Sequence, residues 1–286
     1  MIPVAFDYLR PRTLAEASNA LADSAGDAVI LSGGQSLMTD LKLRRKRPRT
    51  VIDLQSVEGL SAIDVGDGVA RIGAMARQAD IVQQVDVAEQ FPLLVEIAGA
   101  AADPMVRRRG TLVGALCAVE PGGDWLCGCL AMDGIVEIAG AAGKRDVPLT
   151  EFIHGARVTT LGRDEIAVAV RLRAAPRGAR SAYRKVKHIA IGWSIASVAA
   201  VLDIDDGGRC KSARVAVSGA TAWPQRLPSL EAALGVLDLC RRDHLRDAIA
   251  ASLSSVKFSG DYYASAGYRA ERLAMLVEQT VAELAG

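Results

Sequence analysis

The sequence of 286 residues contains few side chains of the kinds that hold metals or iron–sulfur clusters. It has three histidines, which lie far apart, and it lacks a Cys-x-x-Cys pair; its five cysteines are Cys117, Cys127, Cys129, Cys210 and Cys240. An odd number of cysteines without a secretion signal argues against a disulfide framework. We therefore expect no metal ion or cluster bound by this chain alone, and we interpret Cys127 and Cys129, which lie in an apolar run, as buried thiols.

The sequence also lacks an excess of charge of either sign and a long apolar segment. With 34 basic and 33 acidic residues the net charge is +1, which disfavours binding to nucleic acids or to membrane surfaces. The longest apolar stretch without a charge, residues 189–202, has 14 residues, whereas a membrane-spanning helix needs about 20. The first residues carry neither the basic nor the apolar region of a signal peptide, so we expect a cytoplasmic protein.

A basic run at residues 42–47 (Lys-Leu-Arg-Arg-Lys-Arg) is the local exception to this balance of charge. Runs of like charge are usually solvated, so we interpret this run as an exposed loop or helix end. A docking patch for a partner subunit is the functional alternative.

The apolar periodicity predicts an α/β unit at the start of the chain. Half of the residues are hydrophobic and 23% are charged, as in folded proteins, and the length suits roughly two domains. A helix begins after the capping box Thr13-x-x-Glu16, and a short helix or a loop is expected at 37–43. Strands are predicted at 28–31, 50–54, 69–74, 135–139 and 166–173. Helices are predicted at about 78–85, 92–101 and 125–132.

The pattern changes after residues 173–178 (Arg-Ala-Ala-Pro-Arg-Gly), which form the best candidate linker. Three strands are predicted at 181–187, 193–203 and 209–218, and the Asp-Asp-Gly-Gly turn at 205–208 joins the last two as a hairpin. Helices follow at 229–236, 242–253 and 264–284. These elements describe a small C-terminal α+β domain with a three-stranded antiparallel sheet.

Two glycine-rich loops are the most informative feature of the sequence. Residues 32–36 (Ser-Gly-Gly-Gln-Ser) follow the predicted strand 28–31, and residues 110–114 (Gly-Thr-Leu-Val-Gly) run into the apolar segment 116–119, which we interpret as a buried strand. Because glycine has no side chain, a phosphate can approach the backbone N–H groups of such a loop closely. Two loops can hold the two phosphates of one dinucleotide, so the sequence predicts a nucleotide cofactor. Neither loop matches the Rossmann or the P-loop fingerprint.

Several short motifs stand in one order along the chain: Phe6-Asp7-Tyr8-x-Arg10-Pro11, Gly33-Gly34-Gln35-Ser36-Leu37, Val51-Ile52-Asp53-Leu54, Asp103-Pro104-x-Val106-Arg107, Gly110-Thr111, Pro121-x-x-Asp124 and Ala182-Tyr183-x-Lys185. In this order they resemble the medium, FAD-binding subunit of molybdenum hydroxylases. The closest likeness is to the medium subunit of aerobic carbon monoxide dehydrogenases and its relatives in the xanthine dehydrogenase family. The likeness extends over essentially the whole chain.

The resemblance implies a fold and a division of labour between subunits. It implies a two-part α/β FAD-binding domain of the vanillyl-alcohol-oxidase (PCMH) type over residues 1–175, with parts at about 1–56 and 57–175, and a C-terminal α+β domain over 179–286. It further implies noncovalent FAD in this chain, two [2Fe–2S] clusters in a small partner subunit and the molybdenum cofactor in a large one, assembled as a dimer of heterotrimers. Electrons then pass from molybdenum through the clusters to FAD and on to an external acceptor.

The resemblance also implies which residues hold the cofactor, with no catalytic residue and no metal ligand among them. The first loop is implied to cradle the FAD pyrophosphate through Ser32, Gly33, Gly34, Gln35, Ser36 and Leu37. The facing loop is implied to contribute Thr111, Val113, Gly114 and Ala115. Asp124 is assigned to the ribose or adenine end, Lys185 or Tyr183 to the neighbourhood of the flavin ring, Trp193 to the side of the isoalloxazine, and Leu161 to packing on the ring system or adenine.

The second loop departs from the family pattern, which commonly reads Thr-Ile-Gly-Gly-Asn. Val113 replaces a glycine, and a β-branched residue tolerates a positive φ badly. Ala115 replaces an asparagine, and the loss of one hydrogen bond weakens binding by about 1 kcal/mol. We therefore expect FAD to be held differently, more loosely or not at all, and we expect Val113→Gly with Ala115→Asn to tighten binding.

Other roles for these residues stay open from the sequence alone. Asp124 can cap the helix predicted at 125–132, and Thr111 can satisfy a turn. Trp193 can belong to the core or to an interface, and Lys185 can be a solvent-facing strand residue. Two alternative functions accompany these roles: a freestanding flavin oxidoreductase, and a structural subunit with a degenerate flavin site.

Overall fold

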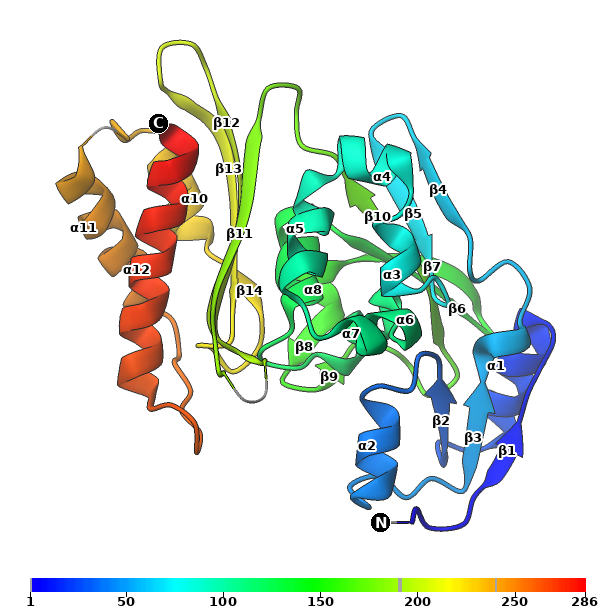
Figure 1. Cartoon of the computed structure of the whole chain (residues 1–286). Helices are drawn as coiled ribbons and strands as arrows, with labels where there is room; N and C mark the ends of the chain where they lie inside the picture. Colours follow the sequence, from blue (N-terminus) through cyan, green and yellow to red (C-terminus); the bar gives the residue numbers. More distant parts are fainter. Residues whose placement is uncertain (1, 190–191, 240) are drawn as a thin grey trace.

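The computed structural model describes residues 2–189, 192–239 and 241–286, so Cys240 lies outside the described residues. Three units follow one another along the chain (Figure 1). They are a small parallel sheet with its helices, a five-stranded antiparallel sheet covered by helices, and a C-terminal sheet covered by three helices. In the part of the chain that the structure describes, no helix is both long enough and apolar enough to cross a membrane.

The first unit confirms the predicted α/β start of the chain. Its strands pair in the order β1-β3-β2, all parallel, and its elements are β1 (Asp7–Leu9), α1 (Leu14–Asp23), β2 (Ala28–Leu31), α2 (Leu37–Lys42), β3 (Thr50–Asp53) and the 3-10 turn η1 (Leu54–Ser56). The capping box forms, because the amide of Glu16 donates to Thr13 Oγ1 and the Glu16 carboxylate accepts from the amide of Arg12. Strand β1 has three residues, which are too few for a periodic pattern, so the sequence does not predict it.

The second unit is an antiparallel sheet with the strand order β4-β5-β10-β6-β7. Its strands are β4 (Ile63–Gly66), β5 (Val69–Gly73), β6 (Ile135–Gly140), β7 (Gly143–Pro148) and β10 (Ile166–Arg173), with a separate small pair, β8 (Ile153–Gly155) and β9 (Val158–Thr159). Its helices are α3 (Gln78–Ile81), α4 (Val85–Gln90), α5 (Pro92–Ala100), α6 (Pro104–Arg109), α7 (Leu112–Ala118), α8 (Asp124–Ala131) and α9 (Leu149–Phe152).

One predicted element of this unit is wrong. The apolar segment 116–119 is not a strand but the end of α7, which begins directly after the second glycine loop and is capped by Thr111. A short apolar run does not by itself distinguish a buried strand from a buried helix. In addition, the helix predicted at 78–85 is the single turn α3, which ends at Ile81, and α4 starts separately at Val85.

The third unit contains the three predicted strands and a short fourth one. The order is β11 (Arg180–Lys187), β12 (Ser194–Ile204), β13 (Cys210–Ser218) and β14 (Gln225–Arg226), all antiparallel. Helices α10 (Pro228–Leu234), α11 (Arg242–Leu253) and α12 (Ala266–Ala285) cover the outer face of this sheet (Figure 1). Residues 194–202 of the uncharged stretch lie in β12, an inner strand of this sheet between β11 and β13.

Strand β12 is buried on both faces, which explains its apolar sequence. Ala199 and Val201 belong to the core shared with α5 and α8 of the second unit, whereas Val198 and Ala200 belong to the core under α10 to α12. Since side chains alternate along a strand, this pattern packs one sheet between two layers of helices. The third unit is thereby attached firmly to α8.

A third cluster joins the first unit to the antiparallel sheet. Ile52 of β3 and Leu54 of η1 pack with Ile166 and Val168 of β10. This contact places the loop that follows β2 against the start of α7. The fold thus brings together the two glycine loops, which are about eighty residues apart in sequence.

Candidate cofactor cavity between two glycine loops

The two glycine loops touch through their backbones. A Cβ atom added at Gly33 would lie 2.4 Å from the carbonyl oxygen of Arg109 and 2.7 Å from Cα of Gly110. No side chain fits at that distance, so only glycine permits this approach. Gly34 has a φ of +76°, a conformation that also favours glycine. The backbone therefore favours glycine at both positions, at Gly33 because of the close contact and at Gly34 because of the positive φ.

A chain of hydrogen bonds joins the loops as well. Thr111 Oγ1 donates to Ser32 Oγ over 3.2 Å, and it accepts from the amide of Gly114, also over 3.2 Å. A Cβ at Gly114 would stand 2.6 Å from Thr111 Oγ1 and 2.7 Å from Ser32 Oγ. Thr111 is thus both the N-cap of α7 and the bridge between the loops, which is more than the simple turn role left open by the sequence.

Two residues that the sequence did not single out hold the second loop from the other side. The amide of Gln78 donates to the carbonyl of Gly110 over 2.9 Å, and Gln78 Nε2 donates to the carbonyl of Thr111 over 3.2 Å. The guanidinium of Arg77 donates to the carbonyl of Arg109 over 2.5 Å. Gln78 is buried, and no motif marks it, because its role depends on a contact 33 residues away.

A cavity of about 640 Å³ opens beside the joined loops. This volume lies in the range of roughly 300–1,000 Å³ typical of ligand sites. Most of the residues implied by the resemblance line it: Ser32, Gly33, Gly34, Gln35, Ser36, Leu37, Thr111, Val113, Gly114, Ala115 and Leu161. Strand β2 contributes further apolar wall through Ala28 and Ile30. The structure therefore collects both loops and Leu161 around one space.

The backbone of the first loop offers donors to a ligand in this space. Within the described part of the chain, the amides of Gly33, Gly34 and Gln35 donate to no backbone carbonyl. Successive free N–H groups in a loop with a left-handed residue form a concave site for an anion. The arrangement suits a phosphate group.

The charged residues along the cavity wall are mostly paired. Arg157 donates to Glu120 over 2.9 Å, and Arg145 binds Glu165 through two nitrogens, each 2.7 Å from a carboxylate oxygen. The hydrogen bonds from Arg145 hold the pKa of Glu165 below its ordinary value. Lys46 and Arg163 also line the cavity, and among the described residues neither forms an ion pair with a carboxylate. They remain available to a negatively charged ligand.

The strain expected at Val113 is absent. Val113 lies inside α7, it is 2% exposed, and it packs in the main core with Leu112 and Leu116. It is not among the residues with a positive φ; the β-branched residue in a left-handed conformation is Val119, with a φ of 41°, at the end of the same helix. The expectation that Val113 distorts the loop is therefore wrong, because the position is helical.

Asp124 and Lys185 form a buried ion pair away from the cavity wall. The ammonium of Lys185 lies 3.0 Å from a carboxylate oxygen of Asp124, and the two side chains are 6% and 11% exposed. The same carboxylate accepts from the hydroxyls of Tyr183 and Ser194 over 2.5 and 2.8 Å. Burial and the Asp124 carboxylate raise the pKa of Tyr183 well above its ordinary value.

These contacts overturn two roles that the sequence left open. The N-cap of α8 is Gly123, and Asp124 is the first helical residue, so Asp124 does not cap this helix with its side chain. Lys185 is buried and does not face solvent. Its ammonium also donates to the carbonyl of Gly192 over 3.2 Å, which connects the pair to the segment that carries Trp193.

Trp193 is half-exposed and does not belong to the core. Its ring lies against Gly122, where an added Cβ would be 3.3 Å from Trp193 Cε3. Gly122 is two residues from Glu120, which lines the cavity. Asp124, Lys185 and Trp193 are thus not among the lining residues, but the turn from Glu120 to Gly123 connects them to the cavity.

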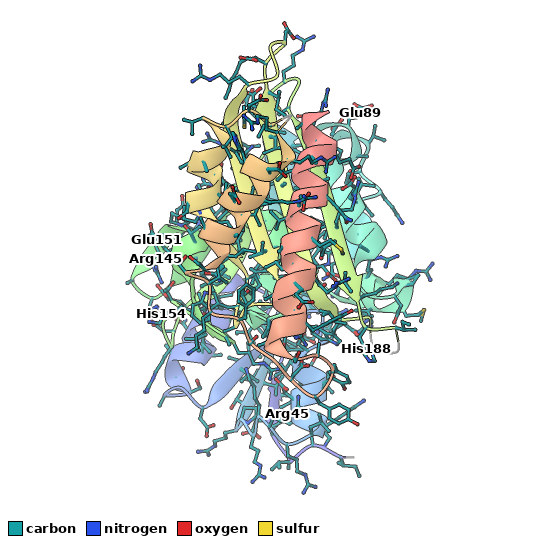
Figure 2. The ribbon with its side chains drawn as sticks, turned by 90° about the vertical axis from the view of Figure 1, so that its left-hand side faces the viewer. Arg45, Glu89, Arg145, Glu151, His154 and His188 are labelled. Carbon is teal, nitrogen blue, oxygen red and sulfur yellow. The ribbon has the colours of Figure 1, made fainter. Side chains whose placement is uncertain are left out.

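The described residues contain no group of three or more His, Cys, Asp or Glu side chains arranged to hold a metal ion. His154 and His188 lie on opposite sides of the molecule (Figure 2). Cys127 and Cys129 are fully buried, as predicted, and burial raises the pKa of Cys127 to about 12. Cys117 lines the cavity, and burial of its thiol likewise raises its pKa to about 12, so it stays protonated at neutral pH.

Comparison with known proteins gives two family matches. Residues 4–174 match the FAD binding domain in molybdopterin dehydrogenase, and residues 181–284 match the CO dehydrogenase flavoprotein C-terminal domain. Together the two matches extend over nearly the whole chain.

Relatives and solved structures agree with these matches. The chain is 32% identical over 280 residues to the nicotine 6-hydroxylase medium subunit of Paenarthrobacter nicotinovorans, covering 98% of this chain and 97% of that one. It is 35% identical over 202 residues to the carbon monoxide dehydrogenase medium chain of Hydrogenophaga pseudoflava, covering 71% and 70%. A solved structure of carbon monoxide dehydrogenase from Hydrogenophaga pseudoflava superposes with a TM-score of 0.94 at 30% identity, covering 100% and 98%. Quinoline 2-oxidoreductase from Pseudomonas putida 86 superposes with a TM-score of 0.90 at 27% identity, covering 100% and 98%.

We expect Gly33→Ala to weaken FAD binding about tenfold or more. The new Cβ meets the backbone of Arg109 and Gly110, and an overpacked contact costs about 1–3 kcal/mol. Flavin fluorescence titration measures the affinity. Gly66→Ala is the matched control, because a Cβ at that position in β4 meets nothing within 4 Å and the affinity should not change. Wild-type affinity in Gly33→Ala would remove the first loop from the site.

We expect Val113→Gly to destabilise the protein by about 1–3 kcal/mol and not to tighten FAD binding. The change deletes a side chain that is 2% exposed and places glycine in a helix, and both effects favour unfolding. Urea unfolding measures the stability, and a flavin titration on the folded variant measures the affinity. A variant with unchanged stability and tighter binding would show that a glycine belongs there after all.

Proposed function

Because this chain belongs to the family of medium, FAD-binding subunits of molybdenum hydroxylases, we propose that it is the electron outlet of such a complex. In this role it holds FAD, accepts electrons from the [2Fe–2S] clusters of a small partner subunit and passes them to an external acceptor. The observation that carries the proposal is the backbone contact of Gly33 with Arg109 and Gly110, which joins two glycine loops around one cavity. The oxidoreductase activity belongs to the whole complex.

The residues of the cavity fit FAD. The free amides of the first loop and the start of α7 are placed to bind the pyrophosphate from two sides, and Lys46 and Arg163 add positive charge to the wall. Leu161, Ala28 and Ile30 offer apolar surface to a ring system. When bound, FAD supplies the redox chemistry, and the chain supplies binding, orientation and electrostatics.

We assign Asp124 and Lys185 a positioning role at the flavin end of the cavity. The Asp124 carboxylate already accepts from Lys185, Tyr183 and Ser194, so little of its capacity is left for a direct cofactor contact. The pair instead fixes the segment around Gly192, and through it Trp193, which we place beside the isoalloxazine. Residues 1–175, in parts at about 1–56 and 57–175, and residues 179–286 are the proposed domains.

An exposed aromatic surface supports the proposed partners. Ile189 and Tyr262 are 97% and 96% exposed, and Trp193, Tyr263 and Tyr268 are also exposed. The rings of His188 and Tyr263, 4.9 Å apart, connect the segment before β12 to the segment before α12. Aromatic residues make up only 4% of the sequence, and the rings of Tyr262, Tyr263 and His188 contact one another at the surface. Exposed Tyr and Trp are typical of interfaces.

We propose that this aromatic surface docks the small iron–sulfur subunit. Trp193 belongs to the surface and also rests on Gly122, next to the cavity-lining turn, so a protein seated there approaches the flavin end of the site. The large molybdenum subunit and the dimer of heterotrimers complete the proposed assembly. The partner surface and the cofactor cavity thus meet at one turn of the chain.

A structural subunit with a degenerate flavin site is the second candidate. Ala115, where relatives commonly carry an asparagine, still favours it, whereas the helical position of Val113 does not. For a freestanding flavin oxidoreductase, no constellation of acid, base or nucleophile is evident among the described side chains of the cavity.

Native purification with an absorbance spectrum tests the proposal. We expect about one FAD for each chain, released as free flavin on denaturation, together with an iron–sulfur and a molybdenum-containing partner. Colourless protein bound to both partners would establish the structural subunit. Yellow protein that turns over a substrate alone would establish the freestanding oxidoreductase.

Substitution in the aromatic surface tests the docking site. We expect Tyr262→Ser combined with Ile189→Ser to weaken binding of the iron–sulfur subunit about tenfold or more, because buried aromatic anchors dominate interface energies. Val236→Ser, an apolar residue that is 81% exposed on another part of the surface, is the matched control and should bind normally. The FAD content should match the wild type in all variants. Equal binding by the double variant would place the partner elsewhere.

A further inference from the structure

A second cavity, of about 460 Å³, adjoins the first glycine loop. Three cationic residues from separate elements line it: Lys42 at the end of α2, Arg77 before α3 and Arg109 at the end of α6. We propose that this cavity binds a phosphate-bearing small molecule in addition to the FAD held in the first cavity. The inference rests on Lys42, Arg77 and Arg109, which the proposed electron-transfer role does not use as ligands.

The loop and helix α2 separate the two cavities. Both cavities share Ser32, Gly33, Gly34 and Gln35. Beyond the loop, Leu37 and Asp40 of α2 face the first cavity, whereas Met38, Thr39 and Lys42 face the second. Residues with that spacing lie on opposite faces of a helix.

The second glycine loop also distinguishes the two cavities. Thr111, Gly114 and Ala115 line the first cavity and do not line the second. A pyrophosphate held between the two loops therefore occupies the first cavity. The second cavity stays open for another ligand.

The cations of the second cavity outnumber the carboxylates near them, although the charges of Asp80 and Asp53 act on Arg77. Among the described residues, Lys42, Arg77 and Arg109 form no ion pair with a carboxylate, and the one carboxylate in the lining is Asp53. Its oxygens are already occupied, since Asp53 accepts from the Tyr8 hydroxyl over 2.6 Å and from the amide of Gln55 over 2.9 Å. With three cationic residues and one carboxylate in the lining, an incoming anion meets net positive charge.

The position of Arg77 is held in advance. Its guanidinium donates to the carbonyl of Arg109 over 2.5 Å, which keeps it at the cavity although Arg109 brings a like charge nearby. Burial and the charge of Arg109 lower the pKa of Arg77 from its ordinary value. An anion between the two guanidinium groups removes this repulsion, and the fork of N–H donors on arginine matches phosphate oxygens.

The remaining lining suits an organic phosphate more than a bare anion. Thr39 and the side chains of Gln35 and Gln55 offer neutral hydrogen-bonding groups, and Leu31 and Met38 offer apolar surface. A volume of 460 Å³ exceeds what one phosphate group fills. The chemical class of the ligand is therefore a phosphate monoester or a nucleoside phosphate.

Calorimetric titration of the full chain, saturated with FAD, tests the proposal with inorganic phosphate as the probe. Ionic strength is kept constant with chloride, because charge contacts depend on salt. We expect saturable binding of one phosphate for each chain. Arg109→Gln and Lys42→Gln should each weaken it about tenfold or more, with FAD content unchanged. Arg108→Gln, an exposed neighbour on α6 that does not line the cavity, should bind as the wild type does.

Three results would overturn the second site. The first is wild-type protein without saturable binding at millimolar phosphate. The second is a loss of affinity in Arg108→Gln as large as that in Arg109→Gln. The third is release of FAD by phosphate in proportion to its own binding. The last result would locate the probe in the cofactor cavity. If the chain did not hold FAD but still bound phosphate in a way that depends on Arg109, this inference would stand and the proposed function would be rejected. Lys42→Gln, on a different helix, still tests the site if Arg109→Gln does not fold.

Discussion

The contact between the backbones of the two glycine loops is the constraint on which the rest of the site depends. Gly33 approaches the carbonyl of Arg109 so closely that no side chain fits between them, and Thr111 completes the contact by bonding Ser32. A cavity bounded by two loops exists only while they stay in contact. Because Gly33 has no side chain, hydrogen-bond donors from two separate units of the fold lie beside one cavity.

Packing from both sides holds this contact in place. On one side, Ile52 and Leu54 of the first unit pack on Ile166 and Val168 of β10 and carry the first loop into position. On the other, Gln78 binds the carbonyls of Gly110 and Thr111 through its backbone and its side chain. Such buried, fully engaged polar groups specify one arrangement, because the loss of either partner leaves an unsatisfied group. The loops are preorganised and need little rearrangement to receive a ligand.

Paired and unpaired charges lie in different parts of the site. The cofactor cavity carries mostly paired charges, whereas Lys42, Arg77 and Arg109 behind the first loop form no ion pair with any described carboxylate. At the far end, the buried pair of Asp124 and Lys185 is compensated by hydroxyl donors, which offset the cost of taking two charges out of water. This pair links α8 to β11, so it ties the third unit to the second next to Trp193. The pair thus lies between the cofactor cavity and the aromatic surface around Trp193 that we propose as the partner surface.

The sequence by itself determined much of the local structure and most of the cofactor wall. The capping box at Thr13, the strands that precede and follow the first loop, and the three long C-terminal strands follow from local periodicity, which depends only on near neighbours. The motifs identified the two glycine loops, the family resemblance implied Leu161, and the structure brings all three to one cavity. Local patterns did not distinguish the end of α7 from a strand. The strain expected at Val113 came from comparison with the family pattern, and the helical position of the residue excludes it.

Only the tertiary structure decided the contacts between distant segments. Gln78 and Arg77 support the second loop, Asp124 pairs with Lys185 across 61 residues, and Lys42 meets Arg77 and Arg109 in one cavity. None of these contacts has a periodic signal, because each depends on how the sheets and helices pack. The reason for glycine at position 33 is of the same kind: the sequence shows the glycine, and the fold shows the carbonyl that excludes every other residue.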